Sequence, residues 1–439
     1  MATTTTHRGH VGAGSAQRLA IDHPLPQLLF YLIVASIPFF QWRQLPGPAF
    51  MKVDWLLMAA LLVMIGVYLM TLKRPPVRLQ SNIWGPLGLF LVANIVSVAF
   101  SPYPEQATGG LIALLQSGVF IVVATLMVND RGVETVLPWV LGLSVGLNAT
   151  LSILGYFFGL ELFTHEGGRA FGATIGANNM ALMCVFTLPL MIHCMIYAST
   201  ASRCWLGALL AVILIFGVFS TVSRGGFVNL LVVLVLVAVQ YRKHFHPRYL
   251  GLLVAGFALA ATLVVAVVPT AFFERQVSLV TEGTQDKSIS RRSYYIRVGL
   301  EAFGERPLMG WGPNAFQEIW VESRAARRFN MEKRPAHNTY MEVAVGSGLV
   351  GLAVFGFLMV RTYRNYAEAQ RLFARQERDR EAHLMGAYKV GVVIVLVYFL
   401  FKSGLEHKYF LLALPLSYAV LAYARRQTGT VLSAAGVGR

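Results

Sequence analysis

The sequence predicts an all-α polytopic integral membrane protein with about twelve transmembrane helices. Of its 439 residues, 56% are hydrophobic and 13% are charged, whereas soluble globular proteins average about 45–50% and about 25%. The mean hydropathy is +0.59, and 28 Phe, 17 Tyr and 7 Trp add to the apolar surface. These values exclude a soluble protein of several globular domains.

A transmembrane helix needs about 20 mostly apolar residues. Apolar runs bounded by Pro, Gly or charged residues predict crossings near 25–42, 54–72, 83–101, 109–128, 135–160, 172–198, 205–222, 226–241, 249–270, 338–361, 386–404 and 408–424. Pro38, Lys402 and Pro415 interrupt the first and the last two of these runs. We expect five regions: a tail at 1–24, crossings one to nine within 25–270, a long loop with short amphipathic helices at 271–337, crossings ten to twelve within 338–424, and a tail at 425–439.

The net charge of +16 would suggest a nucleic-acid partner in a soluble protein, but in a membrane protein the side on which the charges lie matters more. With a cytoplasmic N-terminus, nineteen Lys and Arg lie in the expected cytoplasmic segments and seventeen in the outer ones, eleven of them in the long loop. The positive-inside rule therefore predicts that both termini are cytoplasmic. The polar first 24 residues lack the apolar region of a signal peptide, so we expect the first crossing to direct insertion.

The first candidate motif on the outer side is Ser223-Arg224-Gly225-Gly226, between two apolar runs. An arginine at the membrane marks a functional site by default. Arg224 can bind phosphate or carboxylate through two hydrogen bonds, and the glycines let backbone amides approach the same anion. The alternative is a loop arginine that extends to the lipid headgroups.

The second motif is Gly168-Arg169-Ala170-Phe171-Gly172, followed by Asn178-Asn179. Arg169 lies at the outer end of the next expected crossing and could bind the same anion. The alternative is a glycine-rich turn in which an asparagine caps the helix.

The third motif is Arg291-Arg292, with Tyr294, Tyr295 and Arg297 following at helical spacing in the long loop. This cluster could hold a diphosphate. It could equally be a solvated helix face or lie on anionic headgroups.

The fourth motif, Arg334-Pro335-Ala336-His337-Asn338-Thr339-Tyr340-Met341-Glu342, enters the tenth crossing. His337 at its outer end could accept a proton from a sugar hydroxyl near neutral pH. The alternative is an interfacial or capping histidine without a chemical role. No acidic pair that would hold a divalent ion on a diphosphate occurs among the outer motifs, so no metal is expected.

Together these motifs resemble the O-antigen ligase/polymerase superfamily of bacterial envelope enzymes. The resemblance rests on Ser223-Arg224-Gly225-Gly226, the turn at 307–313, and His337-Asn338-Thr339-Tyr340 with Glu342 and Gly348 after it. The stretch from Gly168-Arg169 to Asn178-Asn179 is similar to a further family feature. The motifs cover about residues 160–360, and the pattern of crossings covers the whole chain.

The resemblance implies a glycosyltransferase of the GT-C type in the bacterial inner membrane, with the long periplasmic loop over a site at the membrane surface. The implied donor is O-antigen polysaccharide on undecaprenyl diphosphate, and the implied acceptor is a sugar hydroxyl of lipid A–core. Because the lipid diphosphate is the leaving group, no nucleotide sugar, cofactor or metal is expected. Membrane lipids are expected partners and nucleic acid is not.

The resemblance also implies roles for the candidate residues. His337 would be the general base for in-line attack with inversion at the anomeric carbon. Arg224 and Arg291 would bind the diphosphate and stabilise its developing charge. Arg169 is a further candidate for this role, and Arg292 could take the place of Arg291.

Three alternatives stay open. Polymerases of the family tend to have two large periplasmic loops with an Arg-x10-Gly pattern. In this sequence the loop at 161–171 is short, and neither Arg169 nor Arg291 has a glycine eleven residues later, which favours the ligase over the polymerase. A protein O-oligosaccharyltransferase would use the same donor. A transporter of an anionic envelope substrate should have broken helices near the bilayer midplane, and the clustering of basic motifs on one face argues against it.

Overall fold

The computed structural model describes residues 21–43, 53–71, 81–165, 169–244, 273, 277, 287–329 and 331–429. Within these ranges the chain is mostly helical, and its strands form one short antiparallel pair, β1 (Thr164–His165) and β2 (Arg169–Ala170). Seven helical segments there are long and apolar enough to cross a membrane: Pro104–Met127, Gly132–Phe158, Ala177–Ile196, Ala201–Ser220, Arg224–Tyr241, Thr339–Ala374 and Asp379–Tyr398. The chain is thus an all-α polytopic membrane protein, as predicted. Twelve crossings stay a prediction: the expected crossings at 25–42, 54–72, 83–101 and 408–424 are not among these seven, and the expected ninth, 249–270, lies outside the described residues.

The helices before the long loop are α1 (Pro24–Ser36), α2 (Val53–Thr71), α3 (Trp84–Ala99), α4 (Pro104–Met127), α5 (Leu137–Phe158), α6 (Ala177–Ile196), α7 (Ala201–Ser220) and α8 (Arg224–Tyr241). The loop carries α11 (Lys287–Glu305) and α12 (Phe316–Glu322), and α13 (Thr339–Ala374), α14 (Asp379–Tyr398) and α15 (Lys408–Gln427) follow it. Side-chain caps define three helix starts: Thr200, Ser223 and Asn338 each accept a hydrogen bond from a backbone N–H in the first turn of α7, α8 and α13.

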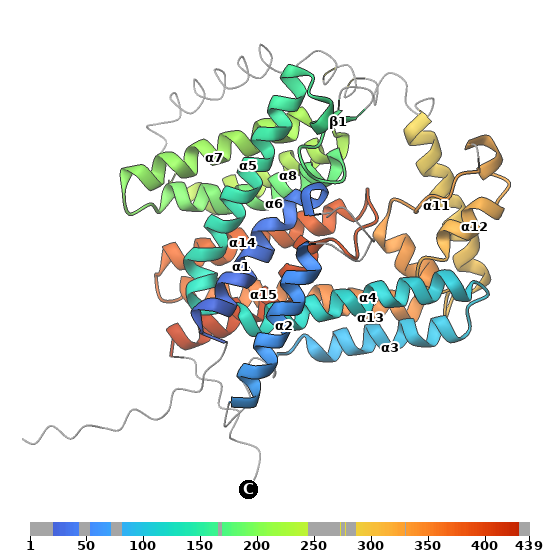
Figure 1. Ribbon diagram of the computed structural model, residues 1–439, viewed down its shortest axis with the longest axis horizontal. Coiled ribbons are helices and arrows are strands. Elements are labelled where there is room, and N and C mark those ends of the chain that lie inside the picture. Colours follow the sequence, from blue (N-terminus) through green and yellow to red (C-terminus); the bar gives the residue numbers. More distant parts are fainter. Residues whose placement is uncertain are drawn as a thin grey trace, which may run out of the picture.

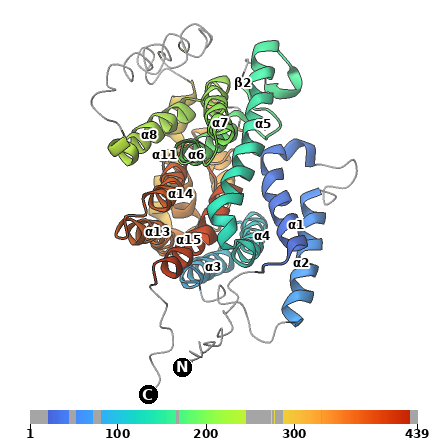
Figure 2. The ribbon, with the colours of Figure 1, turned by 90° about the vertical axis from the view of Figure 1, so that its left-hand side faces the viewer.

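Helix α14 lies inside the bundle, where it packs against α6, α8, α13 and α15 (Figure 2). Aromatic side chains fill the spaces between these helices, and those of Tyr366, Tyr388, Phe355 and Phe399 are almost fully buried. In a lipid bilayer such close packing, rather than the hydrophobic effect, stabilises helix association. Helices α11 and α12 lie at one end of the bundle, beside the ends of α3, α4 and α13 (Figure 1). We call this end the loop end.

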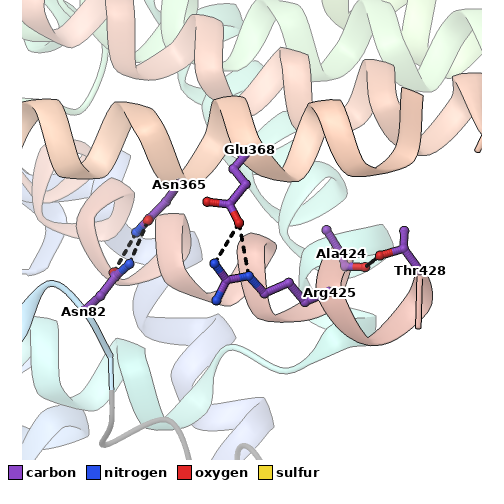
Figure 3. A network of polar contacts seen from close by, with 6 residues as sticks. All are labelled: Asn82, Asn365, Glu368, Ala424, Arg425 and Thr428. Carbon is purple, nitrogen blue, oxygen red and sulfur yellow. Dashed lines mark hydrogen bonds and ion pairs between the residues drawn. The ribbon is translucent and has the colours of Figure 1, made fainter. Parts of the chain in front are cut away.

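Polar contacts join α13 to α15 and to the residues just before α3 (Figure 3). Asn82 and Asn365 exchange two hydrogen bonds of 2.9 Å between their amides. One turn further along α13, Glu368 accepts two hydrogen bonds from Arg425 in the last turn of α15, at 2.7 and 3.2 Å. These pairs satisfy the polar groups of the half-buried side chains at this part of the bundle.

Helix α13 is broken near its start, at Ser347 and Gly348. Gly348 has φ 65° and ψ −163°, a conformation that is essentially restricted to glycine. The break exposes backbone groups, and the turn at 307–312 bonds to them: Trp311 N to Val345 O (2.8 Å), Gly312 N to Gly346 O (2.8 Å) and Leu349 N to Pro307 O (2.7 Å). Unsatisfied backbone groups are costly in a membrane, so the turn and the break depend on each other. The turn thereby attaches the long loop to the first turns of α13, which follow His337 in the sequence.

We expect Gly348→Ala to destabilise the protein. An alanine there would adopt a strained backbone, which costs on the order of 1–3 kcal/mol, and its Cβ would overlap the carbonyl oxygen of Leu308. Gly356→Ala on the same helix is the matched control, because an added Cβ there has no atom within 4 Å. The measurement is the midpoint of thermal unfolding in detergent micelles, and equal midpoints for the two variants would contradict the role of the break.

Candidate functional site

A cavity of roughly 730 Å³ lies at the loop end, and we call it the polar cavity. The first residues of α6 and the segment before it form one wall, and α4 and residues 313–317 form another. The start of α13 and residues 402–408, between α14 and α15, complete it. Five segments from different parts of the sequence therefore meet around one space. Of the five predicted site residues, Arg169 lines this cavity, whereas Arg224, Arg291, Arg292 and His337 are not among its lining residues.

Asn178 joins two motifs that the sequence showed only separately. Its side-chain oxygen accepts a hydrogen bond from the Arg169 guanidinium (3.1 Å) and another from the Ser223 hydroxyl (2.8 Å). The Arg169 Nε also donates to the Thr221 carbonyl at 3.3 Å. We call Arg169, Asn178 and Ser223 the Arg169 group. The group fixes the half-buried Arg169 side chain against the N-terminal end of α8.

Arg224 is the first residue of α8, directly after the capping residue Ser223. The Ser223 hydroxyl accepts the N–H of Gly226 at 3.0 Å, and Asn178 holds that hydroxyl from the other side. The contacts of Ser223 therefore place the backbone of Arg224 next to the Arg169 group. A helix N-terminus carries a partial positive charge, which adds to the two arginines. Gly168 of the predicted motif lies outside the described residues.

His337 lies in the last turn of the long loop, just before Asn338 caps α13. Glu342 shapes this turn, since its Oε1 accepts the N–H of Ala336 (3.1 Å) and the hydroxyl of Ser403 (2.5 Å). The imidazole packs against Tyr295, with ring centroids 5.8 Å apart, and its Nδ1 is buried and makes no hydrogen bond to the described residues.

Burial and positive charge keep His337 neutral. The pKa of His337 is lowered to about 3, and burial is the largest cause. The positive charges of Lys402, Arg292, Arg334 and Arg291 contribute to the same shift. The predicted Arg291-Arg292 pair therefore lies near enough to His337 to act on its charge. A neutral imidazole can accept a proton, but with this pKa it is a weak base, and a bound anion would raise the pKa toward the range that suits a general base. A group of cations without a matching number of anions favours a phosphate ligand.

The two arginines of α11 differ in their surroundings. The Arg291 guanidinium lies over the ring of Phe329, 5.6 Å from its centroid. Arg292 acts electrostatically on both His337 and Lys402. Both side chains are half-buried, so neither is simply a solvated helix face.

Sequence reasoning missed Lys402 as a site residue. Lys402 lines the polar cavity and is the charge with the largest effect on His337. One signal was available: a lysine that interrupts an apolar run at the membrane is itself a functional candidate. The bridging role of Asn178 left no such signal, because it depends on the contact of three segments.

An apolar pocket of roughly 340 Å³ adjoins the polar cavity. It lies between α3, α4, α13 and α15, and the two spaces share the lining residues Phe90, Leu114, Ser117 and Leu405. A charged cavity beside an apolar pocket suits an amphiphile with an anionic head and a hydrocarbon chain. Among the described residues, no three His, Cys, Asp or Glu side chains form a group that could hold a metal ion.

We expect His337 to make the stability of the protein depend on pH. Its folded-state pKa lies below the ordinary value of 6.5, so its contribution is complete above pH 6.5 and is lost as the pH falls toward 3. Between pH 7.5 and pH 5 the loss is about 2 kcal/mol. The midpoint of thermal unfolding should therefore fall less steeply with pH in His337→Gln than in the wild type. Other buried histidines, such as His407, act in both proteins, so parallel curves would contradict the buried neutral imidazole.

Comparison with known proteins bears on the family of the chain. Residues 209–356, about a third of the chain, match the family model described as O-antigen ligase. This range includes Arg224, Arg291, Arg292 and His337 but neither Arg169 nor Lys402. The chain is also 27% identical over 122 residues to the exopolysaccharide production protein ExoQ of Rhizobium meliloti (strain 1021), a match that spans 25% of each chain. The resemblance indicated by the motifs is therefore confirmed for residues 209–356, which match the O-antigen ligase family model.

Proposed function

We propose that the protein is an O-antigen ligase. It would transfer O-antigen polysaccharide from undecaprenyl diphosphate to a sugar hydroxyl of lipid A–core on the periplasmic side of the inner membrane. The observation that carries the proposal is the neutral His337 imidazole, with an unpaired Nδ1, within the electrostatic reach of Arg291, Arg292 and Lys402. A base beside an anion site is what glycosyl transfer from a lipid diphosphate requires.

In the proposed reaction, the acceptor hydroxyl oxygen attacks the anomeric carbon of the donor and transfers its proton to His337. The bond between the anomeric carbon and the diphosphate oxygen breaks at the same time, and its electron pair leaves with the diphosphate. Attack opposite to the leaving group inverts the anomeric configuration. The base is expected to contribute about 10²–10⁴-fold to the rate.

The cations would stabilise the charge that grows on the leaving diphosphate. Arg291 and Arg292 approach from α11, and Arg224 and Arg169 approach from the side of the Arg169 group. Of these side chains, Arg169 is held by Asn178 and Arg291 lies over Phe329, while Ser223 positions the backbone of Arg224. Preorganised donors of this kind need no rearrangement as the reaction proceeds.

We expect His337→Ala and Arg224→Ala each to abolish ladder-type lipopolysaccharide in a strain that lacks its own O-antigen ligase. Loss of the base or of a diphosphate contact should lower transfer by at least about a hundredfold. Arg297→Ala is the control, because Arg297 is an exposed α11 residue paired with Glu301 at 3.2 Å. A wild-type ladder with either site variant would refute the role of that residue.

A polymerase of lipid-linked glycans is the second candidate, favoured by the similarity to a protein named for exopolysaccharide production. It would use the same donor and the same base but a second lipid-linked glycan as acceptor. Purified protein offered both acceptors would separate the two functions. Product attached to lipid A–core supports the ligase, whereas longer chains on the polyprenyl lipid support the polymerase.

We expect the apolar pocket to hold part of the polyprenyl chain of the donor, so filling it should weaken donor binding. Gly118 lines the pocket, and an added Cβ there meets no atom within 4 Å. Gly118→Leu should raise the KM for the donor about four- to fifteenfold, since one or two displaced methylene groups cost about 0.8 kcal/mol each.

Gly66→Leu on α2 is the matched control, because Gly66 is equally uncrowded and does not line the pocket. Transfer assays with purified protein and varied donor concentration measure the effect. Equal KM values for the two variants would show that the lipid chain lies elsewhere.

A further inference from the structure

Residues 399–407, which we call the junction segment, connect α14 to α15 and contact two parts of the site. Thr339, in the first turn of α13, donates its N–H to the Phe399 carbonyl (2.9 Å) and its hydroxyl to the Lys402 carbonyl (2.8 Å). The Ser403 hydroxyl bonds to Glu342. On the other side, a Cβ added to Gly225 in α8 would lie 3.6 Å from the Cβ of Phe401. The junction segment therefore joins the start of α13 to the start of α8.

This position brings Lys402 between the two groups of cations. Its charge acts on His337, and the charges of Arg292 and Arg169 act on Lys402 in turn. Arg292 comes from α11 and Arg169 from the Arg169 group, so Lys402 is electrostatically coupled to both. The side chain also lines the polar cavity, together with Arg169 and Glu342.

Lys402 lacks the partner that would make it a structural lysine. Lys333 forms an ion pair with Glu318 at 2.6 Å, and Lys389 donates to Gln370 at 2.5 Å. Among the described residues, by contrast, no carboxylate lies within 4.0 Å of the Lys402 ammonium, although Glu342 is near enough to act on its charge. Burial is the main cause that lowers the pKa of Lys402. A half-buried ammonium among other cations is stabilised by a bound anion.

We propose that Lys402 is a further diphosphate-binding residue, which links the Arg169 group to the cations around His337. The inference rests on the proposed function for the identity of the anion. A lysine is a compact point charge that can contact either phosphate, whereas the arginines on each side are held by Asn178 and Phe329. Lys402 thus gives one binding surface to two groups that come from different parts of the sequence.

The test compares Lys402→Met with Lys402→Arg in the full chain, purified and reconstituted in nanodiscs. The two probes are undecaprenyl diphosphate and undecaprenol, which share the hydrocarbon chain and differ in charge. Lys402→Met should weaken the binding of undecaprenyl diphosphate about ten- to a hundredfold and leave undecaprenol binding unchanged. Lys402→Arg should retain most of the diphosphate affinity, because it keeps the charge. Arg297→Met removes an exposed cation from α11 and should match the wild type.

Two results would overturn the inference: unchanged diphosphate binding in Lys402→Met, or an equal loss of affinity for both probes, which would indicate a structural role. If Lys402→Met fails to fold, Lys402→Gln carries the same comparison. The proposed function is tested separately, by transfer to lipid A–core. Wild-type protein that binds the diphosphate through Lys402 but transfers no glycan would refute the ligase and leave the role of Lys402 intact.

Discussion

The hydrogen bonds between the turn at 307–312 and the break in α13 are the constraint on which the loop end depends. A helix interrupted inside a bundle has amides and carbonyls that must be paired, and the turn pairs them at Val345, Gly346 and Leu349. The same contacts fix the point on α13 to which the long loop is attached. His337 lies eleven residues before the non-helical Gly348, so its position follows from this attachment.

Positive charge is the second organising feature. Arg169, Arg292 and Lys402 act on one another or on His337 across three different parts of the chain. Their mutual repulsion has to be balanced by the packing and hydrogen bonds that hold their backbones. Asn178, Ser223 and Thr339 supply such bonds from α6, α8 and α13. The repulsion between these cations lowers the free energy of unfolding, and a bound anion would offset this loss. Local conflicts of this kind are typical of functional sites.

Much of the fold could be predicted from the sequence, because a membrane crossing needs a long apolar run and leaves a local signal. All expected crossings within the described ranges overlap helices. The arginines and His337 could also be singled out, since charged residues near apolar runs are rare. The bridge made by Asn178 and the central place of Lys402 could not, because each depends on segments from 45 to more than 200 residues apart meeting in space.

The break in α13 also changes the rotational phase of the helix. An unbroken α-helix turns by about 100° per residue, so all of its side chains keep fixed angles to one another. Gly348 replaces this relation with an angle that its own backbone conformation sets. The part before the break directs Glu342 toward Ser403, and the part after it directs Asn365 and Glu368 toward Asn82 and Arg425. One helix can thereby meet two sets of neighbours that a regular helix of the same length would not face together.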